Sequence, residues 1–284
     1  MTLKSRIISL VLLVSGFSFN LSAGPIAATP LPKLRSAAVL VKDQRTGEFL
    51  MVKRADVAMP IASLTKLMTA MVVLDAHLDM DQVITVEEAD KDRLRNSHSH
   101  LQIGTKLTRR EALLVALMAS ENRAARALGR TFPGGIQALV KAMNNKAKAL
   151  GLSETKFEDP AGLSDSNVSS AQDLSKIVEA ACGYPLICMY STETETTIRS
   201  GKRTLHFMNT NALVRNPNWQ IGLSKTGYIE EAGRCLVMQT QVGQRPVLMV
   251  LLNSTGKNSR LGDANRIKQW LEGPPPKPSR KPHR

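Results

Sequence analysis

Apolar residues form short strand-like runs near both ends of the chain. Ser36 to Lys42 and Glu48 to Lys53 are separated by the polar turn 43–47, and together they predict a β-hairpin. Gly233 to Val242 and Pro246 to Asn253 alternate or run apolar and predict a second pair of strands. Because the two pairs lie at opposite ends of the sequence, we expect them to join in one sheet around an inserted helical region.

Between these runs, apolar residues recur at helical spacing. One apolar stripe predicts a buried helix from Ser63 to about Ala76. Thr108 and Glu111 have the spacing of a capping box, which predicts the start of a helix that reaches Met118. A loop-rich stretch is expected from residue 79 to about residue 106. Three further helices are predicted over residues 135–150, 170–182 and 264–271.

The composition predicts a folded, exported protein. Hydrophobic residues make up 43% of the 284 residues and charged residues 22%, which is enough apolar sequence for a core. Residues 1–23 have a basic start, a short apolar centre and small residues at the end, as a cleaved signal peptide does. That centre is shorter than a bilayer-spanning helix requires, and no other stretch is long enough, so we expect no integral membrane span. Residues 273–284 contain five prolines and predict a disordered basic tail.

The chain is strongly basic, with a formal net charge of +14. Such a charge attracts polyanions. Nucleic acid is not expected as a partner, because only 4% of the residues are aromatic and no basic helix or aromatic RNA-binding signature occurs. An acidic wall polymer or an anionic lipid surface suits an exported protein better, and the basic tail could associate with either. A solvated basic face without a dedicated partner is the alternative.

Cysteine and histidine residues give no metal-binding pattern. Cys182 and Cys188 flank a short turn and could be bridged, whereas Cys235 lies in an apolar run and predicts a buried free thiol. His98 and His100 lack further ligands nearby, which favours ordinary loop residues over a metal pair. We therefore expect neither a metal nor a cofactor.

Three segments match the pattern Ser-x-x-Lys, namely 63–66, 153–156 and 254–257. The first alone opens a long apolar helix, so its hydroxyl lies in the positive field of a helix N-terminus with an amine one turn away. Two later motifs, Ser120-Glu121-Asn122 and Lys225-Thr226-Gly227, are predicted at turns. The order Ser-x-x-Lys, Ser-x-Asn, Lys-Thr-Gly is far more specific than any one motif and is typical of penicillin-binding proteins and class A β-lactamases.

The residues around these motifs resemble low-molecular-mass penicillin-binding proteins over about Ala37 to Trp270. The similar segments are 60–70, 118–125, 157–163 and 223–227, and segments 209–211 and 232–238 most resemble the periplasmic D-alanyl-D-alanine endopeptidases. The resemblance implies an α/β (α+β) fold of the β-lactamase and DD-peptidase kind, with a five-stranded antiparallel sheet flanked by helices. The catalytic domain would span residues 24–272, with an all-helical subdomain inserted at about 75–180.

The resemblance also implies a role for each motif residue. The catalytic residues would be the nucleophile Ser63, the base Lys66 and the proton relay Ser120. Enclosure and the charge of Lys225 would both lower the pKa of Lys66 and so favour its neutral form. The backbone N–H groups of Ser63 and Tyr228 would form the oxyanion hole. The substrate-binding residues would be Asn122, Lys225, Thr226, Gly227 and Tyr228.

These residues predict a periplasmic serine DD-endopeptidase that cuts D-Ala–diaminopimelate cross-links in peptidoglycan. β-Lactam antibiotics would be covalent inhibitors, because segment 159–163 lacks the deacylating glutamate motif of class A β-lactamases. A DD-carboxypeptidase that removes terminal D-Ala is the main alternative. Such enzymes usually add a C-terminal β-domain and an anchor helix, and this chain continues only with a basic tail. A β-lactamase and a non-catalytic β-lactam sensor or wall-binding module are further alternatives.

Overall fold

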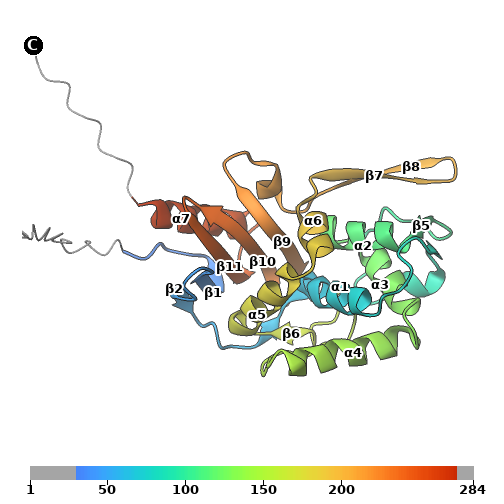
Figure 1. Cartoon of the computed structure of the whole chain (residues 1–284), viewed down its shortest axis with the longest axis horizontal. Helices are drawn as coiled ribbons and strands as arrows, with labels where there is room; N and C mark the ends of the chain where they lie inside the picture. Colours follow the sequence, from blue (N-terminus) through green and yellow to red (C-terminus); the bar gives the residue numbers. More distant parts are fainter. Residues whose placement is uncertain (1–29, 274–284) are drawn as a thin grey trace, which may run out of the picture. The chain divides into compact units, whose positions relative to one another are not determined.

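The computed structural model describes residues 30–273. The predicted signal peptide and the predicted tail from residue 274 onward therefore lie outside the described residues. Within residues 30–273, no helix combines the length and the apolar character that crossing a bilayer requires. A single five-stranded sheet runs through this part of the chain, with helices packed beside it (Figure 1).

The central sheet is antiparallel, and its strand order is β2-β1-β11-β10-β9. Strands from the two ends of the sequence pair directly, since Ser36 on β1 faces Ser254 on β11. This confirms the predicted union of both strand pairs in one sheet. Strand β9, at one edge, was not expected. The five strands are β1 (Ser36–Asp43), β2 (Phe49–Lys53), β9 (Gln220–Ile229), β10 (Gly233–Val242) and β11 (Arg245–Ser254).

The turn between β1 and β2 is held by a local side chain. Asp43 Oδ1 accepts a hydrogen bond from the backbone N–H of Arg45 at 2.9 Å. Gly47 has a φ of 77°, in the region that favours glycine, and nothing lies within 4 Å of where a Cβ would be. The predicted hairpin therefore forms through its own turn residues.

Five of the helices were predicted, and local side-chain caps account for the starts of two of them, α2 and α5. Helix α2 begins with the expected capping box, in which Glu111 N donates to Thr108 Oγ1 at 3.1 Å and Thr108 N donates to Glu111 Oε2 at 2.7 Å. Helix α5 follows the cap Ser170. In the described residues, the α-helices are α1 (Lys66–Asp75), α2 (Arg109–Met118), α3 (Asn122–Arg130), α4 (Gly135–Ala149), α5 (Ala171–Cys182), α6 (Pro185–Thr192) and α7 (Ser259–Glu272).

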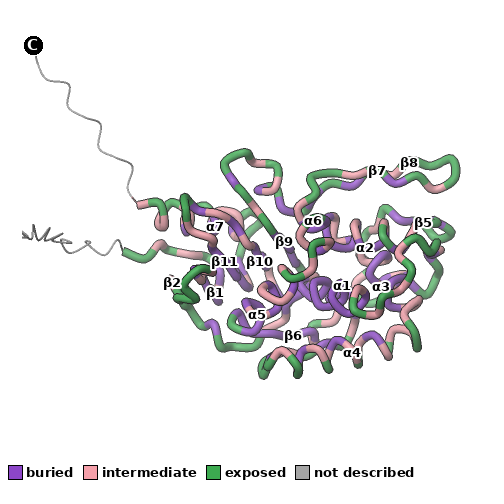
Figure 2. The backbone as a smooth tube through the Cα atoms, in the orientation of Figure 1, coloured by how far each residue is buried: buried purple, intermediate pink, exposed green. Residues whose placement is uncertain are grey.

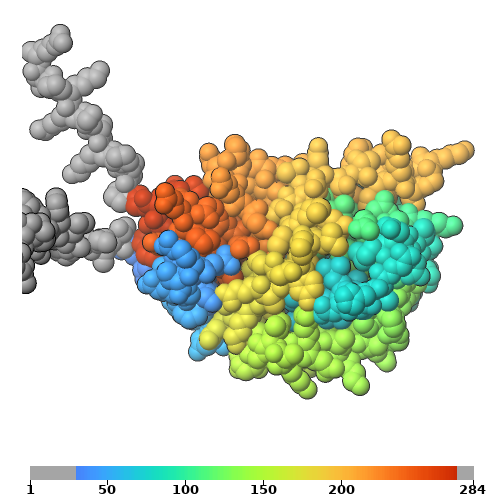
Figure 3. Space-filling model, viewed as in Figure 1, coloured from blue at the N-terminus to red at the C-terminus, as the bar shows by residue number. Residues whose placement is uncertain are grey.

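Several short elements were not predicted, among them helices α3 and α6. Helix α3 buries Ala124, Ala125 and Ala127, and alanines give a weaker apolar signal than larger side chains. The β7–β8 hairpin extends away from the helices beside it (Figure 1), and its tip protrudes from the molecular surface (Figure 3). The other short strands and 3₁₀ turns are β3 (Met59–Pro60), β4 (Val83–Thr85), β5 (Lys106–Thr108), β6 (Val168–Ser169), β7 (Glu195–Ser200), β8 (Arg203–Met208), η1 (Ala62–Thr65), η2 (Glu88–Asp90) and η3 (Ala212–Arg215).

Two apolar cores lie on the two faces of the sheet. Side chains alternate along β1, so that Ala38 and Leu40 join the core that includes α1 and α5, whereas Val39 and Val41 join the core beneath α7. Figure 2 shows the buried backbone concentrated along the central strands and α1. This packing anchors α1, which follows the first motif, against one face of the sheet.

All three cysteines are free thiols. Cys182 Sγ lies 2.9 Å from Gln239 Oε1 on β10, and Cys188 Sγ contacts the carbonyl oxygen of Cys182 at 3.7 Å. The suggestion that these two could be bridged is therefore wrong for this structure. Cys235 is fully buried, as predicted, and burial raises the pKa of its thiol to about 11.

Candidate active site

Ser63 lies in η1, the 3₁₀ turn that leads into α1. The predicted helix from Ser63 therefore exists, but its first residues are wound more tightly than an α-helix. The preceding residue, Ala62, has a φ of 48°, which is unusual for a residue with a side chain. Gly162 packs against this turn: a Cβ there would lie 1.9 Å from the Ala62 carbonyl oxygen and 2.9 Å from Ser63 N. This turn, called the nucleophile turn after the role predicted for Ser63, is thus held in an uncommon conformation by a close backbone contact.

The Lys66 amine faces the Ser63 hydroxyl. Its Nζ lies 2.8 Å from Ser63 Oγ, 2.8 Å from Asn122 Oδ1 and 2.6 Å from the carbonyl oxygen of Ala161. A neutral amine has two N–H groups and one lone pair. The amide oxygen of Asn122 and the carbonyl of Ala161 can only accept, so they take both N–H groups. In the neutral form the lone pair would then face Ser63 Oγ, as the predicted base role requires, whereas in this structure the Ser63 hydroxyl donates to the Ala161 carbonyl at 3.3 Å.

Burial makes the neutral form of Lys66 accessible. The residue is 1% exposed, and desolvation lowers the pKa of its amine to about 7, against the opposing charges of Asp159, Glu121 and Asp92. Burial is the main cause of the lowered pKa of Lys66. The charge of Lys225, which the sequence analysis named as a second cause, is not among the main ones. The pKa of Lys225 is itself well below its usual value, because that amine is buried and repelled by Lys66.

We expect the rate of acylation by a penicillin to depend on the protonation of Lys66. The second-order rate should fall about tenfold per pH unit below a pKa of about 7, because only the neutral amine can act as base. Labelling rates measured from about pH 5 to pH 9 should therefore span about 100-fold before reaching a plateau. Circular dichroism at each pH controls for unfolding. A constant rate across this range in folded protein would assign the base elsewhere.

Ser120 joins the site from the turn between α2 and α3, as predicted. Its φ of 59° belongs to a tight turn, and its Oγ accepts a hydrogen bond from Lys225 Nζ at 2.9 Å. Lys225 Nζ also donates to the carbonyl of Thr226 at 2.9 Å. The next residue, Glu121, caps α3 and accepts a hydrogen bond from Ser99 Oγ at 2.6 Å. The second motif is therefore fixed at its backbone and faces the third.

Lys225, Thr226 and Gly227 lie on the edge strand β9, and the prediction that they form a turn is wrong. A run of lysine, threonine and glycine has no apolar alternation, and the pairing of β9 with β10 supplies the strand conformation. A Cβ on Gly227 would lie 2.9 Å from the carbonyl oxygen of Ile61 and 3.2 Å from Ser63 N. The absence of a side chain at Gly227 therefore lets β9 approach the nucleophile turn.

A pocket of about 290 Å³ opens beside these groups. Its lining includes Ser63, Arg95, Asn122, Gly162 and Tyr228. The Tyr228 side chain is 56% exposed, with the Arg234 guanidinium 4.5 Å from its ring centroid. Of the predicted site residues, Ser63, Asn122 and Tyr228 therefore line this hollow, whereas Lys66, Lys225 and Thr226 are buried.

Sequence reasoning missed two residues that shape the site. The Asp159 carboxylate accepts hydrogen bonds from the backbone N–H groups of residues 161–164, at 2.7 to 3.0 Å, and so holds the loop that presents the Ala161 carbonyl to Lys66. Arg260, on α7, donates to the Gly227 carbonyl at 3.2 Å. Asp159 lies in segment 157–163, which resembles the penicillin-binding proteins. Arg260 lies in no motif, so no local signal could have found it.

The two other Ser-x-x-Lys segments do not form such pairs. Lys156 Nζ bonds the carboxylate of Glu158 at 2.8 Å, and Ser153 is exposed. Ser254 is buried on β11, whereas Lys257 is exposed. Within residues 30–273, no three histidine, cysteine or carboxylate side chains gather as a metal site, and the rings of His98 and His100 pack edge to face.

Comparison with known proteins identifies the family. The profile of peptidase family S11, described as D-alanyl-D-alanine carboxypeptidase, matches residues 26–256. The D-alanyl-D-alanine endopeptidase of Pseudomonas aeruginosa is 44% identical over 280 residues, which cover 95% of this chain and 89% of that protein. The Escherichia coli D-alanyl-D-alanine endopeptidase is 43% identical over 243 residues, covering 85% and 78% respectively. The Streptomyces K15 DD-transpeptidase is 28% identical with a TM-score of 0.79, over 85% of this chain and 98% of that one. The chain therefore belongs to the S11 family of serine D-alanyl-D-alanine peptidases.

Proposed function

We propose that this protein is a serine DD-endopeptidase that cuts D-Ala–diaminopimelate cross-links in peptidoglycan through an acyl-enzyme. The observation that carries the chemistry is the 2.8 Å approach of Lys66 Nζ to Ser63 Oγ, with two fixed acceptors orienting the amine. The choice of endopeptidase rests on the similarity to proteins of that name from Pseudomonas aeruginosa and Escherichia coli. A DD-carboxypeptidase is the second candidate, favoured by the description of the family profile.

In the proposed reaction, Ser63 Oγ attacks the carbonyl carbon of D-Ala while Lys66 takes its proton. The resulting oxyanion accepts hydrogen bonds from the backbone N–H groups of Ser63 and Tyr228, and one such donor is typically worth about 10²–10³ in rate. The C–N bond then breaks, and the leaving amine takes the proton that Lys66 removed from Ser63, relayed through the Ser120 hydroxyl. Water hydrolyses the acyl-enzyme and restores Ser63.

The substrate is held beside this centre by groups on two elements. Lys225 and Thr226 bind a carboxylate in this proposal, and its negative charge would favour the protonated form of Lys225. Arg260 adds a second cation behind the same strand, since it donates to the Gly227 carbonyl. Asn122 holds the substrate amide, and its Nδ2 donates to Ser97 Oγ at 2.9 Å in the free protein.

β-Lactams would acylate Ser63, and the resulting acyl-enzyme would be hydrolysed slowly. Glu158 is exposed and pairs with Lys156, and both oxygens of Asp159 accept loop N–H groups. Neither carboxylate is therefore placed to activate a hydrolytic water at Ser63, which supports inhibition over β-lactamase turnover.

The protein would act in the periplasm after export by the signal peptide at residues 1–23, and the tail at 273–284 would contact the wall or the membrane. Both proposals rest on the sequence alone. They agree with the lack of a membrane-spanning helix within residues 30–273.

Incubation with purified cross-linked dimeric muropeptides tests the proposed reaction. We expect dimers to be converted to monomers, because the acyl group is transferred from the cross-link amide to water. Liquid chromatography and mass spectrometry measure the conversion. Protein first treated with benzylpenicillin is the control and should leave the dimers intact. Release of terminal D-Ala alone, with intact dimers, would replace the endopeptidase assignment with the carboxypeptidase.

A further inference from the structure

A second, larger pocket adjoins the catalytic one. Its volume is about 600 Å³, against about 290 Å³ for the pocket at Ser63. Leu163 borders both. The two pockets also share their walls, since segment 91–97 and segment 159–164 each contribute residues to both. The two hollows therefore adjoin along Leu163 and are together called the groove below; only the smaller one is lined by Ser63.

The far part of this groove, hereafter the basic pocket, is lined by Lys91, Arg93 and Arg126. Two acidic residues also border it, but loop amides occupy their oxygens. Asp92 accepts the backbone N–H groups of residues 94, 95 and 97 at 2.9 to 3.0 Å, and Asp159 accepts those of residues 161–164. Three cations and two carboxylates therefore line the pocket, and the oxygens of both carboxylates are directed to loop amides rather than left free.

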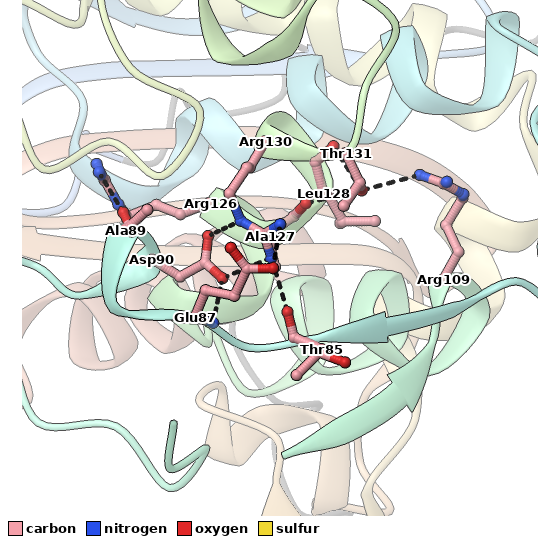
Figure 4. Close-up of polar contacts among 10 residues, drawn as sticks. All are labelled: Thr85, Glu87, Ala89, Asp90, Arg109, Arg126, Ala127, Leu128, Arg130 and Thr131. Carbon is pink, nitrogen blue, oxygen red and sulfur yellow. Dashed lines mark hydrogen bonds and ion pairs between the residues drawn. The ribbon is translucent and has the colours of Figure 1, made fainter. Parts of the chain in front are cut away.

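The part of helix α3 that carries Arg126 is held in place by Arg130, one turn further along the helix. Arg130 bonds both oxygens of the buried Asp90 at 3.0 Å and the carbonyl of Thr85 at 2.7 Å, which ties α3 to η2 (Figure 4). Arg126 Nη2 donates to the Ala89 carbonyl at 3.0 Å. Its buried Nε has no hydrogen-bond partner in the described part of the chain. Arg126 is thus positioned at the wall through its Nη2, while its Nε is unpaired but shielded from solvent.

The other two cations are held less firmly. Lys91 Nζ pairs with the exposed carboxylate of Glu88 at 2.8 Å, a surface contact that contributes little. Arg93 is exposed at the rim. Both can turn toward an anion in the groove at small cost.

We propose that the basic pocket is a subsite for the carboxylates of a peptidoglycan peptide arm bound next to Ser63. The inference rests on the proposed function, because it extends the same substrate along the same groove. Guanidinium groups recognise carboxylates through paired hydrogen bonds, and three cations around one hollow suit a peptide with several acidic groups. A penicillin has a single carboxylate, which the proposed function assigns to Lys225 and Thr226, so its reaction should not need the basic pocket.

The double variant Arg93→Gln/Arg126→Gln tests the subsite. We expect its KM for dimeric muropeptides to rise about tenfold, the usual scale for losing a charge-assisted hydrogen bond, while penicillin acylation stays within about twofold. The matched control is Lys141→Gln/Lys148→Gln, which removes the same charge from exposed positions on α4 and should change neither value. Dimers with amidated peptide carboxylates should bind the wild type and the Arg93/Arg126 variant equally.

Two results would overturn the subsite: an unchanged KM for the double variant, or an equal loss of penicillin acylation, which would point to a disturbed fold or catalytic centre. Affinity for dimers is also measured by calorimetry in a Ser63→Ala background, where no cleavage occurs. Wild-type protein that leaves dimers uncut, with binding that still depends on Arg93 and Arg126, would refute the endopeptidase reaction and keep the subsite. Binding that is insensitive to both residues would refute the subsite alone.

Discussion

The Ser63→Ala variant should show no covalent labelling by a fluorescent penicillin, and its turnover of muropeptides should fall by roughly 10⁴-fold or more. The methyl group cannot attack a carbonyl, and no acyl-enzyme can form. Since Ser63 Oγ contacts Lys66 Nζ at 2.8 Å, the variant also removes the proton that the amine is placed to accept. Labelling is measured on gels and by the mass of the intact protein.

The chain provides its own control for this variant. Ser153 belongs to the same Ser-x-x-Lys pattern, but it is exposed and Lys156 is paired with Glu158. Ser153→Ala should therefore keep full labelling. Unfolding curves of both variants should match the wild type. Covalent label on folded Ser63→Ala protein would show that another residue is the nucleophile.

The Gly162→Ala variant should lose about 3 kcal/mol or more in the free energy of unfolding. It should also lose acylation by penicillin. Gly162 has a φ of 75°, where a side chain costs roughly 1–2 kcal/mol. Its new Cβ would also fall 1.9 Å from the Ala62 carbonyl oxygen, so the nucleophile turn would have to move. Such overpacking typically adds about 1–3 kcal/mol.

Gly47→Ala separates the two costs. Gly47 has nearly the same φ, 77°, but nothing lies within 4 Å of its Cβ position. Its variant should lose only the roughly 1–2 kcal/mol of backbone strain and retain acylation. Urea unfolding and penicillin labelling of both variants make the comparison. Equal losses at the two positions would mean that the Gly162 contact does not support the active site.

Local sequence was sufficient to predict an element wherever residues within that element stabilise its conformation. The capping box at Thr108 and Glu111 starts α2 through contacts three residues apart. The β1–β2 turn is closed by Asp43 and Gly47 from within the hairpin. Helix α3 escaped prediction because its buried face consists mainly of alanines, whose burial depends on what packs against them. The strand at Lys225 was not predicted because its conformation depends on pairing with the neighbouring strand β10.

The sequence by itself thus determined the order of the three motifs, the sheet made from both ends of the chain, and the family. It singled out Ser63 and Lys66 among three Ser-x-x-Lys segments, but it could not show their surroundings, nor reveal Asp159 and Arg260 as supports of the site. Those outcomes depend on partners far apart in the chain: Lys66 and Asn122 are separated by 56 residues, and Ser120 and Lys225 by 105. Burial of the amines and the approach of Gly162 to the nucleophile turn arise only when these segments pack together, because desolvation and close backbone contact are properties of the assembled core.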